Sequence, residues 1–400
     1  MANNTITSPA GFLAAGVKSG IKASGKEDIG VIYCPEGAKA AAVFTTNKVV
    51  SAAVDVCRTN LKSRNTMAIV VNSGNANTCT GKTGLKNAEK MCQTLAAELG
   101  CKDEEVLLAS TGIIGHQLPM DKVVSGIKAA AAEKSSNEKS GHNFANAILT
   151  TDTVEKNAVK KFKIGKSTIT VAGTVKGAGM IAPNMATTLC FLTTDINISK
   201  PMLQKAIAIG IGCSLNKLTV DAHQSTNDTA ILLSSCKAGN EAIKKADADF
   251  DKFVKALCGV CESLAKEMAK DAEGATRIFK VLIKGAATAA DAAKAARAVA
   301  DYDLVKCAIH GGDPNWGRII CAVGSCGVKI NDSKLTCKLD KLTVFRNGQP
   351  AKFDVEKASK IVSSPEHTIT VELGAGKYED YCYGCDLSKD YVTINADYHT

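Results

Sequence analysis

The chain has 400 residues, of which 45% are hydrophobic, 22% charged and 4% aromatic, with a net charge of +9. This composition excludes fibrous and disordered proteins, and the length predicts two or three structural units. The basic residues are spread evenly without interleaved aromatic residues, and no apolar run reaches the roughly 18 residues of a membrane span, so neither nucleic acid nor a membrane is an expected partner.

The first part of the chain alternates between strand and helix patterns. Residues 67–71 form a short apolar run typical of a buried strand. Residues 85–99 predict a helix that places Leu85, Ala88, Cys92, Leu95 and Leu99 on one face and ends at Gly100. A strand at 106–109 is followed by a helix that Pro119 opens.

The same alternation continues to the C-terminus. Residues 160–175 predict a hairpin turning at Gly165, followed by a strand at 187–194 and helices at 201–211 and 241–270. From residue 278 a new strand, an Ala-rich helix and several strand-like runs follow. The order predicts an α/β protein of layered sheets with outer helices and a smaller C-terminal α/β subdomain from about residue 280 to residue 400.

Several of the sixteen cysteines lie in apolar runs, as Cys190 does, which predicts buried thiols. A reducing compartment is expected, because the N-terminus lacks the basic and apolar regions of a secretory signal. We therefore expect a cytoplasmic protein. A zinc site would need the pair Cys258/Cys261 to meet the pair Cys382/Cys385, and we expect no metal. The six histidines form neither HxH nor HExxH, and we expect them in the core or on the surface.

Residues 76–83, Ala-Asn-Thr-Cys-Thr-Gly-Lys-Thr, resemble a phosphate-binding loop in which Ala76 replaces the first glycine. The loop follows a strand and precedes a helix, as such loops do. A P-loop nucleotide-binding protein that depends on Lys82 is therefore one hypothesis, and a polar loop at a helix entry is the structural alternative.

The segment 176–195 brings a loop of small residues directly into a strand that begins with Thr187. A loop-to-strand junction would explain its glycines. A threonine that becomes a new N-terminus explains more, because its freed α-amine can take the proton of its own hydroxyl. An α-amine titrates near pH 7.7–8.0, which suits this task.

This segment resembles the processing site of the ornithine acetyltransferase (glutamate N-acetyltransferase) family of arginine biosynthesis, and the resemblance extends over essentially the whole chain. Six further stretches in a fixed order support it: Asn-Ser-Gly-Asn-Ala-Asn-Thr-Cys-Thr-Gly at 72–81, Ala-Ser-Thr-Gly-Ile-Ile-Gly at 109–115, Leu-Thr-Thr-Asp-Thr at 149–153, Glu-Gly-Ala-Thr-Arg at 273–277, Gly-Asp-Pro-Asn-Trp-Gly-Arg at 312–318 and Asn-Ala-Asp-Tyr at 395–398.

The resemblance implies a precursor that cleaves itself between Ala186 and Thr187, giving an α chain (1–186) and a β chain (187–400). Thr187 then carries an acetyl group from N-acetylornithine to glutamate. Thr111 and Gly112 match the oxyanion-hole pair. The matching substrate-binding positions are Thr150, Lys176, Thr187, Glu273, Asn395 and Thr400.

The resemblance further implies a stacked-sheet αββα sandwich like the N-terminal-nucleophile folds, and an assembly of two α and two β chains. No cofactor is implied, although acetyl-CoA is a candidate second donor. An N-terminal-nucleophile amidase or aminopeptidase, with water as acceptor, is the alternative of the same chemistry. Ala222-His223-Gln224 replaces the usual Gly-Asp-Thr, and Gly312 and Cys382 are atypical, which leaves local loop details open.

Overall fold

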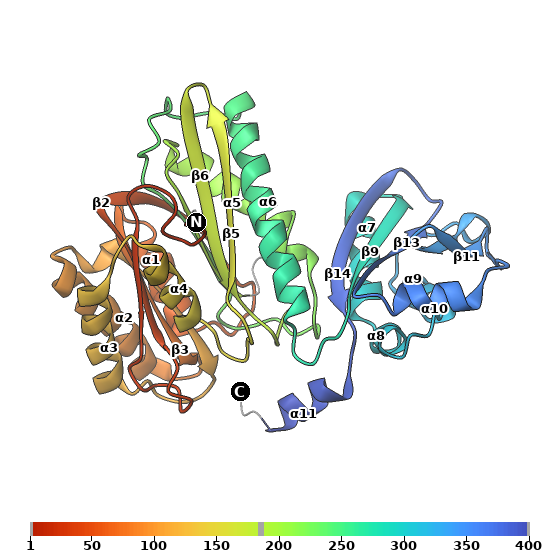
Figure 1. Ribbon diagram of the computed structural model, residues 1–400, viewed down its shortest axis with the longest axis horizontal. Coiled ribbons are helices and arrows are strands. Elements are labelled where there is room, and N and C mark those ends of the chain that lie inside the picture. The colour runs from red at the N-terminus through yellow and green to blue at the C-terminus, as the bar shows by residue number, and fades with distance from the viewer. Residues whose placement is uncertain (1–2, 183–187, 398–400) are drawn as a thin grey trace.

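The computed structural model describes residues 3–182 and 188–397 and shows two α/β units side by side (Figure 1). An eight-stranded sheet forms the first unit and a six-stranded sheet forms the second. None of the helices in these residues is long and apolar enough to cross a membrane.

The first sheet has the order β4-β3-β2-β8-β7-β6-β5, and β1 pairs with β2 beside this path. The 16-residue β2 pairs with β3 through its first half and with β8 through its second half, so it joins two half-sheets. The strands are β1 (Leu13–Val17), β2 (Ile29–Phe44), β3 (Thr66–Asn75), β4 (Val106–Ile113), β5 (Lys156–Ile164), β6 (Ser167–Lys176), β7 (Leu189–Thr194) and β8 (Thr229–Ser234).

Alternating side chains show that the two half-sheets are stacked. In β3, Ile69 and Val71 share one core cluster with Phe191 and Ile231 of the other half-sheet. Their neighbours Ala68 and Val70 face a cluster formed with outer helices. Because successive side chains of a strand point to opposite faces, each half-sheet has one helix-covered face and one face against its partner. This arrangement confirms the predicted αββα sandwich.

The outer helices cover the two sides of this sandwich. Helices α2 and α3 pack on the β1–β4 half, while α5 and α6 pack on the β5–β8 half. The helices of this unit are α1 (Ala52–Asn60), α2 (Gly81–Leu99), α3 (Met120–Glu133), α4 (Glu138–Ala147), α5 (Lys200–Gly212) and α6 (Ala248–Lys270).

Two details of the predicted helices are wrong. Leu85 is 40% exposed, because α2 starts at Gly81 and its buried stripe passes through Gly84, Ala88, Met91 and Leu95. The helix expected from residue 241 begins only at Ala248, where the side chain of Asp247 caps it by accepting the backbone N–H of Phe250 at 3.1 Å. The hairpin at Gly165 and the helix after Pro119 are confirmed.

The second unit is a sheet of order β12-β11-β10-β13-β9-β14 whose apolar face packs on its helices. Its elements are β9 (Ile278–Ala286), α7 (Ala289–Asp301), α8 (Asp303–His310), α9 (Trp316–Ser325), β10 (Thr336–Leu339), β11 (Leu342–Arg346), β12 (Gln349–Pro350), α10 (Val355–Val362), β13 (Glu366–Glu372) and β14 (Tyr378–Cys385). Short 3-10 helices occupy Asp103–Glu105 and Leu215–Lys217 in the first unit and Asp332–Lys334 in the second.

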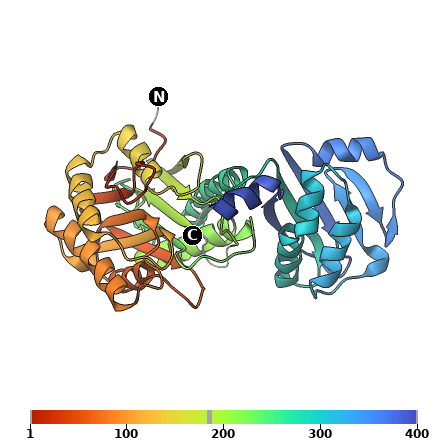
Figure 2. The same ribbon diagram turned by 90° about the horizontal axis from the view of Figure 1, so that it is seen from below.

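The two units share part of their cores. Ile278, Tyr383 and Cys385 of the second sheet pack into the cluster that contains α6. The Tyr381 hydroxyl donates to the backbone oxygen of Cys213 at 2.9 Å. The last helix, α11 (Lys389–Asp397), leaves β14 and passes back under the first unit (Figure 2). The structure thereby brings the C-terminal helix to the end of the first sheet.

The two CxxC pairs remain separate. Cys258 and Cys261 lie on α6, and Cys382 and Cys385 lie in β14. The Cys258 sulfur is 2.8 Å from that of Cys213, outside either pair. In the part of the chain that the structure describes, no three His, Cys, Asp or Glu side chains are grouped to hold a metal ion.

Candidate active site

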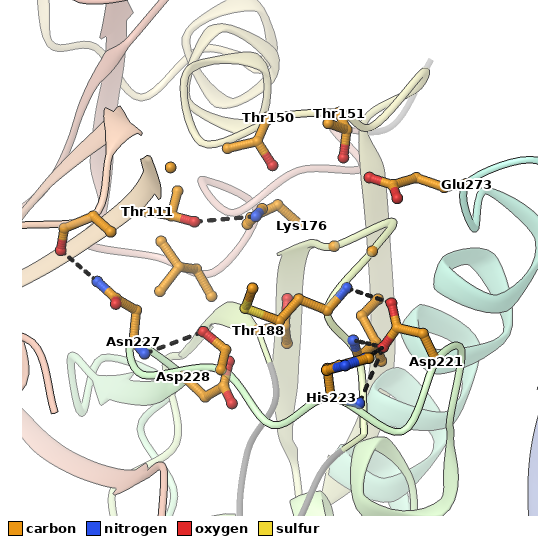
Figure 3. A pocket seen from close by; sticks show the side chains of 18 of the residues that line it. Thr111, Thr150, Thr151, Lys176, Thr188, Asp221, His223, Asn227, Asp228 and Glu273 are labelled. Atoms are coloured by element: carbon orange, nitrogen blue, oxygen red, sulfur yellow. Dashed lines mark hydrogen bonds and ion pairs between the residues drawn. The ribbon is translucent and has the colours of Figure 1, made fainter. Parts of the chain in front are cut away.

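A pocket opens at the end of the first sheet where β4 and β6 stop and β7 and β8 begin (Figure 3). Its wall is built from segments far apart in the chain: the ends of β4 and β6, the loop 177–181, the segment 221–228, and α11. Because these segments come from both units, the pocket exists only in the folded chain.

The strand register sets the rim of the pocket. Lys176 at the end of β6 pairs with Leu189 at the start of β7, and Leu189 pairs with Thr229 at the start of β8. The residues directly before these two starts are Thr188 and Asp228, and both line the pocket. Thr188 directly follows Thr187 in sequence, whereas Ala186, Thr187, Thr400 and His399 lie outside the described residues.

Thr111 and Gly112 lie in the last three residues of β4, at the same rim. Gly112 has φ +131°, and a Cβ there would overlap the backbone of Gly74, so this position requires glycine. The Nζ of Lys176 donates to the hydroxyl oxygen of Thr111 at 3.1 Å. The Thr111 hydroxyl therefore acts as a hydrogen-bond acceptor toward Lys176, and its own proton can be donated to a ligand.

Lys176 belongs to a buried network of charges. Burial lowers the pKa of Lys176, while Asp152 and Asp228 oppose this shift. Asp152 binds the Nζ of Lys156 at 2.7 Å and accepts the N–H of Gly177 at 2.6 Å. Burial by itself would raise the pKa of Asp152, but Lys176 and Lys156 outweigh it and the pKa is lowered. The network therefore fixes the loop that follows β6.

Glu273 and Asn395 form the opposite side of the pocket. The side-chain amide of Asn395 on α11 donates to a carboxylate oxygen of Glu273 at 2.8 Å. A Cβ at Gly179 would overlap that carboxylate, so the glycine lets Glu273 reach the wall. Thr150 lines the pocket next to Thr151. Six of the residues expected from the sequence thus meet in one pocket: Thr111, Gly112, Thr150, Lys176, Glu273 and Asn395.

Asp221 is a pocket residue that sequence reasoning did not assign. Its carboxylate accepts the N–H groups of Met180 at 2.7 Å and Ile181 at 2.9 Å. The Tyr391 hydroxyl of α11 donates to the same carboxylate at 3.2 Å. Asp221 therefore joins the loop after β6 to the C-terminal helix.

Asp228 was also unassigned. It is 2% exposed, and its Oδ2 has no hydrogen-bond partner among the described residues. Burial raises the pKa of Asp228 well above its ordinary value, although Lys176 and the hydrogen bonds from Ser225 oppose the shift. The signal in the sequence was a run of polar residues ending directly before an apolar strand.

Most of the other candidates from the sequence lie outside the pocket. Lys82 is exposed and does not line the pocket, so the loop 76–83 provides no phosphate-binding lysine there. Of the described histidines, only His223 lines the pocket, with a side chain that is 72% exposed. His310 binds Asp386 at 2.8 Å, and burial lowers the pKa of His367 to about 4.

Known proteins of one family are similar to this chain over nearly its full length. The model of the ArgJ family matches residues 13–400. The chain is 43% identical to the arginine biosynthesis bifunctional protein ArgJ of Symbiobacterium thermophilum over 397 residues, which are 99% of this chain and 98% of that protein. The ArgJ protein of Streptococcus thermophilus is 44% identical over 399 residues, 100% of this chain and 99% of that protein. The solved ornithine acetyltransferase of Mycobacterium tuberculosis, complexed with ornithine, is 36% identical over 46% of this chain and 98% of that chain, with a TM-score of 0.42.

Proposed function

The chain belongs to the ArgJ family, and from this membership we propose that it is an acetyltransferase of arginine biosynthesis that moves an acetyl group from N-acetylornithine to glutamate. The observation that carries the proposal is that one pocket is lined by Thr111, Gly112, Lys176 and Glu273, together with Thr188. In acyl transfer between amino acids, a hydroxyl and a backbone N–H can stabilise the developing oxyanion. A cation and a carboxylate can pair with the charged groups of the substrates.

The first step in this proposal is self-cleavage. The Thr187 hydroxyl attacks the Ala186 carbonyl, and water hydrolyses the resulting ester, which separates residues 1–186 from residues 187–400. The anchoring of the backbone at Met180 and Ile181 by Asp221 supports this step, because it holds the approaching chain at the pocket wall.

Acetyl transfer then proceeds through an acetyl ester on Thr187. Its α-amine takes the hydroxyl proton, and the developing oxyanion accepts hydrogen bonds from the Thr111 hydroxyl and the Gly112 N–H. Lys176 pairs with a substrate carboxylate and Glu273 with a substrate ammonium group, while Thr150, Asn395 and Thr400 complete the contacts. The hydrogen bond from Asn395 to Glu273 supports this assignment, because it orients the carboxylate.

The assembly and location follow the family expectation. We propose two copies of each fragment in a cytoplasmic enzyme without a cofactor. The word bifunctional in the names of the relatives makes acetyl-CoA the second donor to be tested.

The test uses the purified chain. It should run as two fragments, the second beginning Thr-Thr-Leu-Cys. Mixing it with N-acetylornithine alone should release ornithine in a stoichiometric burst and leave acetyl on the 187–400 fragment, which glutamate then discharges. Intersecting initial-rate lines with no acetyl on the fragment would contradict the covalent scheme. Rapid discharge by water alone would favour an amidase.

A further inference from the structure

The acids of the pocket differ in what they already bind. Asp221 accepts from two backbone N–H groups and the Tyr391 hydroxyl, and Glu273 accepts from Asn395. Asp228 also lines the pocket, but its Oδ2 is buried without a partner in the described part of the chain. A buried carboxyl oxygen without a hydrogen bond is costly, which points to a ligand as its missing partner.

The position of Asp228 is fixed by its neighbours. The side-chain amide of Asn227 donates to the backbone oxygens of Ala76 at 2.6 Å, directly after β3, and of Ser110 at 2.8 Å in β4, so it ties this segment to the strand that carries Thr111. The backbone oxygen of Thr188 accepts the N–H of Thr229 at 2.8 Å, so Asp228 lies opposite Thr188 in the parallel pairing. The Thr188 hydroxyl is likewise buried without a partner in the described residues.

The proposed reaction also requires proton transfer at the substrate nitrogen. The leaving nitrogen of N-acetylornithine must gain a proton when its bond to the acetyl carbon breaks, and the amine of glutamate must lose one when that bond forms. Burial keeps the Asp228 carboxyl protonated at a pH where an exposed aspartate would be ionised, because its pKa is raised well above the ordinary value. A carboxylic acid of this kind can donate a proton in one direction and accept it in the other.

We propose that Asp228 is the general acid and base for the substrate nitrogen, a role that rests on the acetyl transfer proposed above. In the first half-reaction the Thr187 oxygen bonds to the acetyl carbon, and its proton passes to the α-amine. The carbon–nitrogen bond breaks, and the departing nitrogen takes the proton of Asp228. The α-ammonium then returns a proton to the Asp228 carboxylate. The second half-reaction runs through the same steps in reverse with glutamate.

The test compares substrates that need this proton with substrates that do not. N-acetylornithine expels an amine that must be protonated, whereas p-nitrophenyl acetate expels a stable phenolate. The amine of glutamate must lose a proton as the amide bond forms, whereas azide attacks without a proton to lose. Asp228→Asn should slow acetylation by N-acetylornithine and deacetylation by glutamate by about 10²–10⁴-fold, while the rates with p-nitrophenyl acetate and azide stay at wild-type values.

Asp195→Asn is the matched control. Asp195 is a buried aspartate directly after β7, at the strand end away from the pocket, and its carboxylate accepts the N–H of Thr170 at 2.8 Å. All four rates should be unchanged in this variant. An equal loss with all four substrates in Asp228→Asn would overturn the inference, because Asp228 would then act on the nucleophile or the fold. Undiminished transfer from N-acetylornithine to glutamate would overturn it as well.

Folding and the proposed function are checked separately. If Asp228→Asn is not recovered as two fragments, Asp228→Ser, which leaves room for water at the carboxyl position, is measured with the same four substrates. Failure of both variants to fold or self-cleave would make Asp228 structural and overturn the inference. If the wild-type enzyme carries no acetyl group on the 187–400 fragment, the covalent scheme fails instead, whatever Asp228→Asn does.

Discussion

Replacing Thr111 by valine removes one hydroxyl from the end of β4 and keeps the β-branched shape that suits a strand. Thr111 is 8% exposed, and its hydroxyl accepts from the Nζ of Lys176 at 3.1 Å. Losing that partner from a buried cation should cost about 1–3 kcal/mol of folding free energy. Losing an oxyanion donor should cost about 2.7–4 kcal/mol in the transition state, or 10²–10³-fold in rate.

The assay measures both half-reactions of Thr111→Val. Because the same oxyanion forms when Thr187 is acetylated and when it is deacetylated, both rates should fall by similar factors, while the acetyl group still reaches the fragment in the end. Thr193→Val is the control, because its buried hydroxyl donates to the backbone oxygen of Ile6 at 2.7 Å, outside the pocket. It should lower the free energy of unfolding without slowing transfer. Loss of one half-reaction alone, or unchanged rates, would refute the oxyanion role of Thr111.

Four further outcomes are expected. Thr187→Ala should remain a single chain on a denaturing gel, and cleavage of this variant would place the nucleophile elsewhere. Gly179→Ala should raise KM for N-acetylornithine more than it lowers kcat, because the added Cβ displaces the carboxylate of Glu273; an unchanged KM would remove Glu273 from the donor site. Deleting Thr400 should slow turnover more than self-cleavage, and equal losses measured on the same preparation would indicate a folding role. Because the pKa of Asp152 is lowered, its carboxylate stabilises the fold above the ordinary value of 3.8, and this contribution is lost as pH falls below it. Asp152→Asn should therefore lose less stability than wild type between about pH 4 and pH 2 in denaturant titrations.

Local pattern sufficed for much of the fold. The apolar alternation of the β5–β6 hairpin, the opening of α3 after Pro119 and the buried stripe through Ala88 and Leu95 depend on contacts between near neighbours, and the structure agrees with each. The order of six motifs around Thr187 was likewise enough to indicate the family, because the relatives match over the full length.

The sequence pattern predicted helix ends and buried faces less accurately, because these depend on capping side chains and on packing. The hydrophobic and lysine periodicity before residue 248 looked helical, but Asp247 caps α6 and the preceding segment instead places Ile243 beside Ile198. Leu85 satisfied the helical spacing, yet the approach of Gly84 to Thr80 turns the buried side of α2 away from it.

Tertiary structure alone decided which polar groups share the pocket and what state they are in. Lys176 comes from β6, Asp228 from the residue directly before β8, and Asn395 from α11. Only the strand register and the return of the C-terminal helix bring them together. The pKa of Asp228 and the missing partner of its Oδ2 depend on burial by many distant segments. The sequence shows that residue 228 has a carboxyl group. Whether this carboxyl holds a proton depends on its exclusion from solvent and on the nearby charge of Lys176, and both arise from the fold.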